Sequence, residues 1–149
     1  MKVVVQVKLL PDAGQAAALE TTLATTNSAA CWLSEQAQAN EDRRSRSALQ
    51  SDHYPDVKAL GLSAQPALHV IRKVADAYKT RSANLNAGNY GPKTGERYRR
   101  VAGEPIRFRA GAAQPFDDRC LSWQYDAGTV SIWTTHGRLK DLRFIGSAD

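Results

Sequence analysis

The sequence predicts an α+β fold, in which an antiparallel β-sheet or partial β-barrel is interrupted by a helical bundle of about three helices. Three patterns lead to this prediction: a valine-rich stretch near the start, helical periodicity through the middle, and alternating apolar and polar residues near the end. An early strand that is separated from the other strands by helices indicates a helical insertion into a β-domain. The chain of 149 residues is long enough to bury a usable core.

The first two elements are expected to be a short strand and a long helix. Residues 2–9 are rich in valine, which favours a strand, and Pro11 ends that strand. Asp12 and Gln15 have the spacing of a capping box, so a helix should begin here and continue towards residue 40. The apolar face of this helix contains Leu19, Leu23, Ala30 and Leu33.

The middle of the helical section is less determined by its sequence. Residues 41–52 are polar, and they either extend the first helix or form a mobile connector. His53-Tyr54-Pro55 indicates a break, because proline interrupts helices. Residues 55–62 predict a short helix or a turn that ends near Gly61.

The next helix has the clearest amphipathic pattern of the chain. It is expected over about residues 64–84, with Ser63 as a candidate N-cap. Its apolar stripe contains Ala67, Val70, Ile71, Val74, Ala77 and Tyr78. Its basic residues lie mostly off that stripe, which is more typical of a solvent-facing side than of a DNA contact.

The last third of the chain predicts a linker followed by strands. Residues 86–105 are rich in Gly, Asn, Lys and Arg, which indicates a loop. Alternation then predicts a strand at Ile106–Arg109 and an antiparallel meander whose strands lie near 120–125, 130–135 and 138–145. The predicted organisation is a first strand at 1–10, a helical insertion at 11–86, a basic linker at 87–105 and the remaining strands at 106–149.

The positive charge is concentrated in one block. Residues 69–110 contain ten basic and three acidic side chains, a net charge of +7, whereas the parts before and after this block are each at −1. Cations neutralise phosphates, and the rings of Tyr90, Tyr98 and Phe108 are of the kind that stacks on unpaired bases. A solvated basic loop explains the composition equally well. Trp123, Tyr125 and Trp133 are more typical of a β-core than of a stacking surface.

No group of residues predicts catalysis or metal binding. The three histidines, His53, His69 and His136, lie in unrelated contexts, so no nucleophile can be paired with a base. Asp117-Asp118 precedes a predicted strand, where a pair of carboxylates is more typical of a solvated turn than of a metal site. We therefore expect no catalytic residue, no metal ion and no cofactor.

The two cysteines and the start of the chain indicate the compartment. Cys31 and Cys120 have no ligand or disulfide spacing, so free thiols in a reducing compartment are expected. No signal peptide and no apolar run long enough to cross a bilayer is present. A cytoplasmic protein without a membrane partner is expected.

Several segments are similar to parts of one known family. They are Lys8–Gln15, where a strand leads into Leu-x-Pro-x-x-x-Gln, the helix Val70–Lys79 ending in Ala-Tyr-Lys, Phe116–Tyr125, Thr129–Thr135, and Gly137-Arg138-Leu139. In this order, over nearly the whole chain, they resemble the N-terminal portion of the OrfB or TnpB family of transposon-encoded RNA-guided endonucleases, which is related to type V CRISPR effectors.

The resemblance implies a fold and a ligand. In that family a wedge-like β-barrel domain is interrupted by a helical recognition domain, and together they hold a guide RNA and read a short DNA motif. Cleavage belongs to a later RuvC-like domain with a zinc ribbon nearby, so this chain is not expected to be a nuclease. The candidate nucleic-acid-binding residues are Gln65, Arg72, Lys73, Lys79, Arg81, Lys93, Arg97, Tyr98, Arg99, Arg100, Arg107 and Arg109.

Two functional hypotheses follow. In the first, the chain is a TnpB-like fragment that binds guide-like RNA, DNA or both without cleavage, with a C-terminal partner chain or a homodimer as candidate protein partners. In the second, the chain is an inactive transposon remnant or a dimerising interaction module with no specific nucleic-acid partner.

Overall fold

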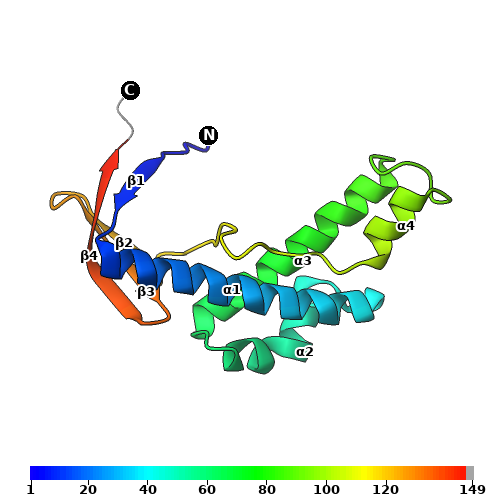
Figure 1. Cartoon of the computed structure of the whole chain (residues 1–149), viewed down its shortest axis with the longest axis horizontal. Helices are drawn as coiled ribbons and strands as arrows, with labels where there is room; N and C mark the ends of the chain where they lie inside the picture. Colours follow the sequence, from blue (N-terminus) through cyan, green and yellow to red (C-terminus); the bar gives the residue numbers. More distant parts are fainter. Residues whose placement is uncertain (147–149) are drawn as a thin grey trace.

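The computed structural model describes residues 1–146 and combines one open antiparallel sheet with a helical unit (Figure 1). The strands follow the order β1-β4-β3-β2 across the sheet. They are β1 Val7–Leu10, β2 Leu121–Gln124, β3 Thr129–Thr134 and β4 Gly137–Gly146. The helices are α1 Ala13–Ala39, the short 3-10 helix η1 Glu41–Arg43, α2 Arg46–Ala59, α3 Ala64–Asn86 and α4 Glu96–Gly103. The predicted α+β class is confirmed.

The first and last strands pair with one another, although the helices separate them in sequence. In β1 and β4, Val7 lies opposite Gly146 and Leu10 lies opposite Arg143. The predicted meander is present as β2, β3 and β4. The first strand is shorter than predicted, because residues 1–6 have no partner strand within the described part of the chain.

One face of the sheet forms a small core against the start of α1. Val130, Ile132 and Leu142 are buried there, and Leu19 of α1 packs against them. The capping box that begins α1 is confirmed, since Asp12 Oδ1 accepts from the Gln15 amide at 2.7 Å and Gln15 Oε1 accepts from the Asp12 amide at 3.0 Å. With 27 residues, α1 is about 40 Å long, so it reaches from this sheet core into the helical unit (Figure 1).

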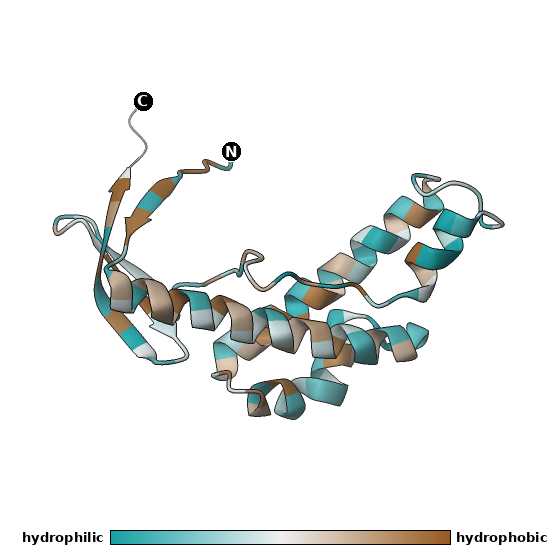
Figure 2. Ribbon diagram, viewed as in Figure 1, coloured by the Kyte–Doolittle hydropathy of each residue, from teal (hydrophilic) through white to brown (hydrophobic). Residues whose placement is uncertain are grey.

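The larger core lies among α1, α2 and α3. Its buried residues include Leu33 of α1, Leu49 and Val57 of α2, and Ile71 and Val74 of α3. In Figure 2 the C-terminal half of α3 and most of α4 are largely hydrophilic. Within residues 1–146, no helix combines the length and the apolar content that crossing a membrane requires.

The predicted break at His53-Tyr54-Pro55 is wrong. Helix α2 continues through this segment, with Pro55 inside it. A proline in a helix interior costs about 3 kcal/mol. Leu49 and Val57, one on each side of Pro55 in sequence, are fully buried against the neighbouring helices, and this packing outweighs the local preference.

The predicted linker at 87–105 contains a helix that the composition concealed. Tyr98, Val101 and Ala102 lie three and four positions apart and form the half-buried side of α4, whereas Arg97, Arg99 and Arg100 are exposed. A helix of eight residues is marginal in isolation. Its side-chain contacts with α1 and α3, described below, therefore decide its formation.

The predicted strand at Ile106–Arg109 is also wrong, although its alternation is real. Ile106 and Phe108 pack against the helical core, and Arg107 and Arg109 are exposed. Among residues 1–146, no strand pairs with this extended segment. Side chains of the helices bind its backbone instead: Cys31 Sγ bonds both the amide and the carbonyl of Phe108 at 3.3 Å, and Asn27 Nδ2 donates to two further carbonyls, those of Ala110 and Ala112.

Candidate nucleic-acid interface

Helix α4 is held beside α3 by side chains that bind its C-terminal end. Arg81 of α3 donates to the carbonyl oxygens of Val101 at 3.0 Å and Glu104 at 2.6 Å, and to Gln38 Oε1 at 2.8 Å. Gln38 of α1 in turn donates to the Ala102 carbonyl at 3.0 Å. A cation at this end of a helix also complements the helix dipole. Two helices of the core thus fix the orientation of α4.

Arg81 is therefore part of the core and not of the surface. Only 8% of the residue is exposed, and its guanidinium lies 4.5 Å from the centroid of the buried Tyr78 ring. Arg44 lies over the same ring, at 4.9 Å. The structure therefore places Arg81 away from the predicted interface, because both terminal nitrogens of its guanidinium donate to groups inside the protein.

Lys73 has an internal role as well. Its Nζ donates to Asn27 Oδ1 and, at 3.4 Å, to Gln114 Oε1, and it lies 5.3 Å from the centroid of the Phe108 ring. Burial lowers the pKa of Lys73 from its ordinary value. These contacts hold the extended segment that follows α4 against α1 and α3, so the structure places Lys73 between elements and not on the predicted interface.

The other predicted binding residues of α3 lie at separate positions along the helix. Gln65 is half-buried in the first turn, at the opposite end of α3 from α4 (Figure 1). Arg72 is exposed and lies 3.9 Å from Asp76, one turn further on. Lys79 is exposed, on the side of α3 that faces Arg44. The structure therefore does not bring Gln65 together with the basic block.

Six predicted cations remain exposed on α4 and the segments beside it, and we call them the α4 cations. Within residues 1–146, none of them has a carboxylate within 4.0 Å. The Arg97 guanidinium lies over the ring of Tyr90, 5.2 Å from its centroid. Tyr98 is half-buried on the inner side of α4. The α4 cations are Lys93, Arg97, Arg99, Arg100, Arg107 and Arg109.

A groove of about 620 Å³ separates α3 from α4 and the segment that follows it. The aromatic rings of Tyr90 and Phe108 line this groove together with Ile106. The carboxylates of Asp76 and Glu104 line it too, so it is less attractive to anions than the outer side of α4. Sequence analysis did not find the groove, because α4 had been predicted as a loop.

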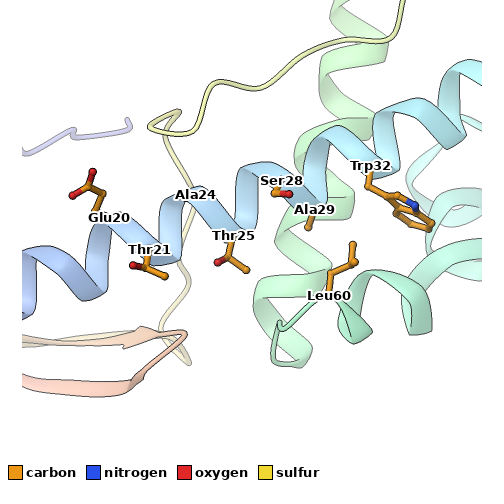
Figure 3. A pocket seen from close by; sticks show the side chains of 8 residues that line it. All are labelled: Glu20, Thr21, Ala24, Thr25, Ser28, Ala29, Trp32 and Leu60. Carbon is orange, nitrogen blue, oxygen red and sulfur yellow. The ribbon is translucent and has the colours of Figure 1, made fainter.

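A second cavity, of about 660 Å³, lies along α1 (Figure 3). It is lined mostly by small side chains such as Ala24, Thr25 and Ser28, with Trp32 at one end and Leu60 opposite. None of the predicted binding residues lines it. Glu20 is its one titratable lining residue, so it lacks a pair of groups for acid–base chemistry.

The aromatic residues of the sheet form a separate surface. Trp123 and Tyr125 are stacked with ring centroids 6.1 Å apart and planes 12° apart, and Tyr125 is 75% exposed. They lie at the opposite end of the molecule from α4 (Figure 1). Trp133 is half-buried, and its Nε1 donates to Ser63 Oγ at 3.1 Å. Ser63 occupies the N-cap position of α3, but its hydroxyl makes this contact and does not cap the helix.

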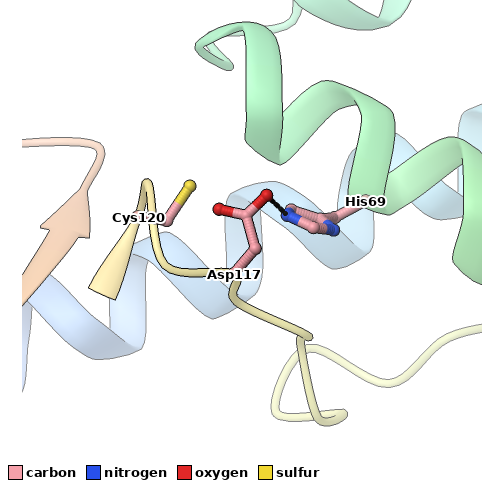
Figure 4. A group of neighbouring side chains, drawn as sticks. All are labelled: His69, Asp117 and Cys120. Carbon is pink, nitrogen blue, oxygen red and sulfur yellow. Dashed lines mark ion pairs between the residues drawn. The ribbon is translucent and has the colours of Figure 1, made fainter. Parts of the chain in front are cut away.

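Three side chains that can bind metals meet where α3 contacts the sheet. His69, Asp117 and Cys120 each place one ligand atom within 4.8 Å of the others, and Figure 4 shows the Asp117 carboxylate between the ring and the thiol. His69 Nε2 lies 3.1 Å from Asp117 Oδ2. The other oxygen, Oδ1, accepts from the Arg119 amide at 2.9 Å, which agrees with the predicted turn.

The pKa values of Asp117 and Cys120 are shifted by their surroundings. Desolvation alone would raise the pKa of Asp117, but the backbone amide of Arg119 and the neighbouring His69 outweigh it and hold that pKa below its ordinary value. Burial raises the pKa of the Cys120 thiol, and the Asp117 carboxylate raises it further. Both cysteines are free thiols, as predicted. Sequence analysis considered Asp117-Asp118 as a metal site and favoured a solvated turn, and it could not connect His69 or Cys120 with that turn, because the three residues follow no ligand spacing.

No family model, curated protein or solved structure matches the chain. The resemblance to the OrfB or TnpB family therefore rests on the sequence segments alone. The functional argument that follows rests on charge and geometry.

Proposed function

We propose that the chain binds RNA or DNA through the α4 cations and does not cleave it. The observation that supports this proposal is the exposure of Arg97, Arg99 and Arg100 on one short helix, with no carboxylate partner among residues 1–146. Phosphate groups are the natural counter-charge for such a cluster. The function requires only that α4 stay docked, which Arg81 and Gln38 ensure.

Folding accounts for only part of this cluster: Arg100 lies in the last turn of α4, where a cation is favoured, and Arg97 lies over the Tyr90 ring. Arg97 and Arg99 lie in the first turns of α4, where the helix dipole disfavours cations, and Glu96 is the single acidic residue in the first turn. Arg97 and Arg100 are three positions apart, a spacing at which like charges cost about 0.2–0.5 kcal/mol. A ligand that neutralises them offsets both costs. The arrangement is therefore better explained by binding than by stability.

The neighbouring ring favours a nucleic acid with unpaired bases. Tyr90 is half-buried below Arg97, at the edge of the groove between α3 and α4. An aromatic face and a cation next to each other can bind a base and its phosphate together. We infer that RNA with single-stranded parts is the preferred ligand, in line with the guide-like RNA that the TnpB resemblance implies. Gln65 lies too far along α3 to contribute to the same contact.

A dimerising module is the second candidate. The valines of the N-terminal segment, Val3, Val4 and Val5, are 73%, 86% and 74% exposed, and they lead into the edge strand β1. The other edge strand, β2, has the exposed Trp123–Tyr125 pair on or beside it. Unpaired edges with apolar side chains favour pairing with another chain. This hypothesis predicts a mass that depends on concentration and no affinity for RNA.

The test compares two triple charge reversals in a binding assay. Fluorescence anisotropy with a hairpin RNA that has a single-stranded loop would give Kd at several salt concentrations. We expect Arg97→Glu/Arg99→Glu/Arg100→Glu to raise Kd at least about tenfold and to reduce the slope of log K against log salt by about 2, since single strands lose about 0.7 per phosphate contact.

The matched control reverses three exposed lysines elsewhere: Lys2→Glu/Lys58→Glu/Lys140→Glu. It changes the net charge by the same amount and should retain most of the affinity. If both variants bind RNA equally well, binding is non-specific and α4 is not the interface. If the wild-type protein binds no RNA and light scattering shows a dimer, the second candidate replaces the first.

A further inference from the structure

We propose that His69, Asp117 and Cys120 form a zinc site that joins α3 to the segment entering β2. The three residues belong to different parts of the chain: His69 lies in α3, and Asp117 and Cys120 lie in the turn before β2. They supply one imidazole, one carboxylate and one thiol, all within 4.8 Å of one another. The proposal does not depend on nucleic-acid binding.

The separations suit a tetrahedral ion. Zinc bonds of about 2.0–2.1 Å to nitrogen and 2.0–2.2 Å to oxygen place two such ligands about 3.3 Å apart in a tetrahedron. The observed distance from His69 Nε2 to Asp117 Oδ2 is 3.1 Å. Zinc-bound nitrogen and sulfur lie about 3.6 Å apart. Because the three ligand atoms all lie within 4.8 Å of one another, the cluster has to contract by about 1 Å at most to bind the ion.

The imidazole nitrogen lacks a hydrogen bond. His69 Nε2 is buried, and although Asp117 Oδ2 is near, the contact does not have the geometry of a hydrogen bond. Buried polar atoms are nearly always satisfied, so an unsatisfied one calls for an explanation. A metal ion would use the lone pair of this nitrogen directly.

The donor set suits zinc and disfavours the hard cellular cations. A thiolate and an imidazole disfavour magnesium and calcium, which prefer oxygen ligands. Three protein ligands leave a fourth position for water. Access is possible because the Asp117 side chain is 30% exposed, while Cys120 is buried.

The location indicates a structural effect. Trp133 of β3 also donates a hydrogen bond to Ser63, which lies at the N-terminus of α3 six residues before His69. A zinc ion bound by His69 and Cys120 would tie the same two units through bonds far stronger than that hydrogen bond. The ion should therefore stabilise the junction between the helical unit and the sheet.

Cobalt replaces zinc in such sites and reports a thiolate ligand by a charge-transfer band in the near ultraviolet. The purified, metal-free protein would be titrated with Co²⁺ and then with Zn²⁺. We expect one Co²⁺ per chain with this band, its loss when Zn²⁺ is added, and a higher melting temperature with Zn²⁺. Cys120→Ser and His69→Asn should lose the band and bind Zn²⁺ at least tenfold more weakly.

The second cysteine supplies the control. Cys31→Ser changes a thiol that lies outside the cluster and should leave the band unchanged. Should Cys120→Ser fail to fold, X-ray absorption of the Zn²⁺-loaded wild-type protein decides the question, with one sulfur and three nitrogen or oxygen ligands expected. A wild-type protein without the band, a band that persists in Cys120→Ser, or a zinc shell without sulfur would overturn the proposal.

Discussion

Replacing Arg81 by methionine removes the guanidinium that binds the end of α4 while keeping a long apolar side chain in its place. Three hydrogen bonds are lost, two to carbonyl oxygens of the α4 end and one to Gln38, together with the contact over the Tyr78 ring. Hydrogen bonds from a charged donor contribute about 1.5–3 kcal/mol each, but bonds from one side chain are not additive. The freed carbonyls can also bind water once α4 detaches.

We therefore expect Arg81→Met to lower the free energy of unfolding by about 3 kcal/mol. Urea denaturation followed by circular dichroism measures this loss, and hydrogen exchange locates it. The amides of α4 should lose most of their protection, whereas those of β3 and β4 should exchange faster only by the amount that the fall in global stability dictates. RNA affinity should fall as well, because the α4 cations lose their fixed orientation.

The matched control is Arg72→Met on the same helix. Arg72 is exposed, and its distance of 3.9 Å from Asp76 makes it a weak ion pair, so the change should stay within about 0.5 kcal/mol. A loss below about 1 kcal/mol for Arg81→Met, with α4 amides protected as before, would show that α4 is held by its apolar side and that the reasoning is wrong.

Three further predictions concern stability. Leu33→Ala, at a fully buried position of α1, should cost about 2–5 kcal/mol in urea unfolding; a cost under 1 kcal/mol would mean that the core collapses around the gap. Asp12→Ala removes the cap of α1 and should cost about 1 kcal/mol, and an unchanged urea midpoint would show that α1 does not need it. The Arg43 side chain lowers the pKa of Asp52 by its hydrogen bond, so the pair contributes stability above the unfolded pKa of the carboxyl that is lost as the pH falls through the lower folded value. Asp52→Asn should therefore be slightly less stable than wild type at pH 7 and equal to it at pH 2, and a difference that persists in acid would contradict this assignment.

Elements with local signals were predictable from the sequence. The capping box at Asp12 and the apolar stripe of α3 depend on residues within one or two turns, so they can be recognised without tertiary information. The strands of the meander can be recognised locally as well, since apolar and polar residues alternate along them and turns separate them. The elements that were predicted incorrectly depend on distant partners: α2 continues past Pro55 because of α3, and α4 forms because of Arg81 and Gln38.

The same distinction applies to the candidate sites. The exposure of the cations on α4 could be predicted from composition, because burying many unpaired charges is costly and a dense basic segment therefore lies at the surface. Arg81 and Lys73 belong to the same block, and nothing local separates them from their neighbours. Only their positions on the inner side of α3 show that they bind backbone and amide groups inside the protein. The approach of His69 to Cys120 depends on the packing of α3 against the sheet and is equally invisible in the sequence.

The pairing of β1 with β4 has a consequence for synthesis on the ribosome. Val7 lies opposite Gly146, so the first strand has no partner until nearly the whole chain has been made. At about 5–20 residues per second, this delay is on the order of 10 s. The helical unit is complete well before then, because its last element ends at Gly103. For that interval β1 and the exposed valines that precede it have no partner strand, so the nascent chain presents an extended apolar segment that is prone to aggregation.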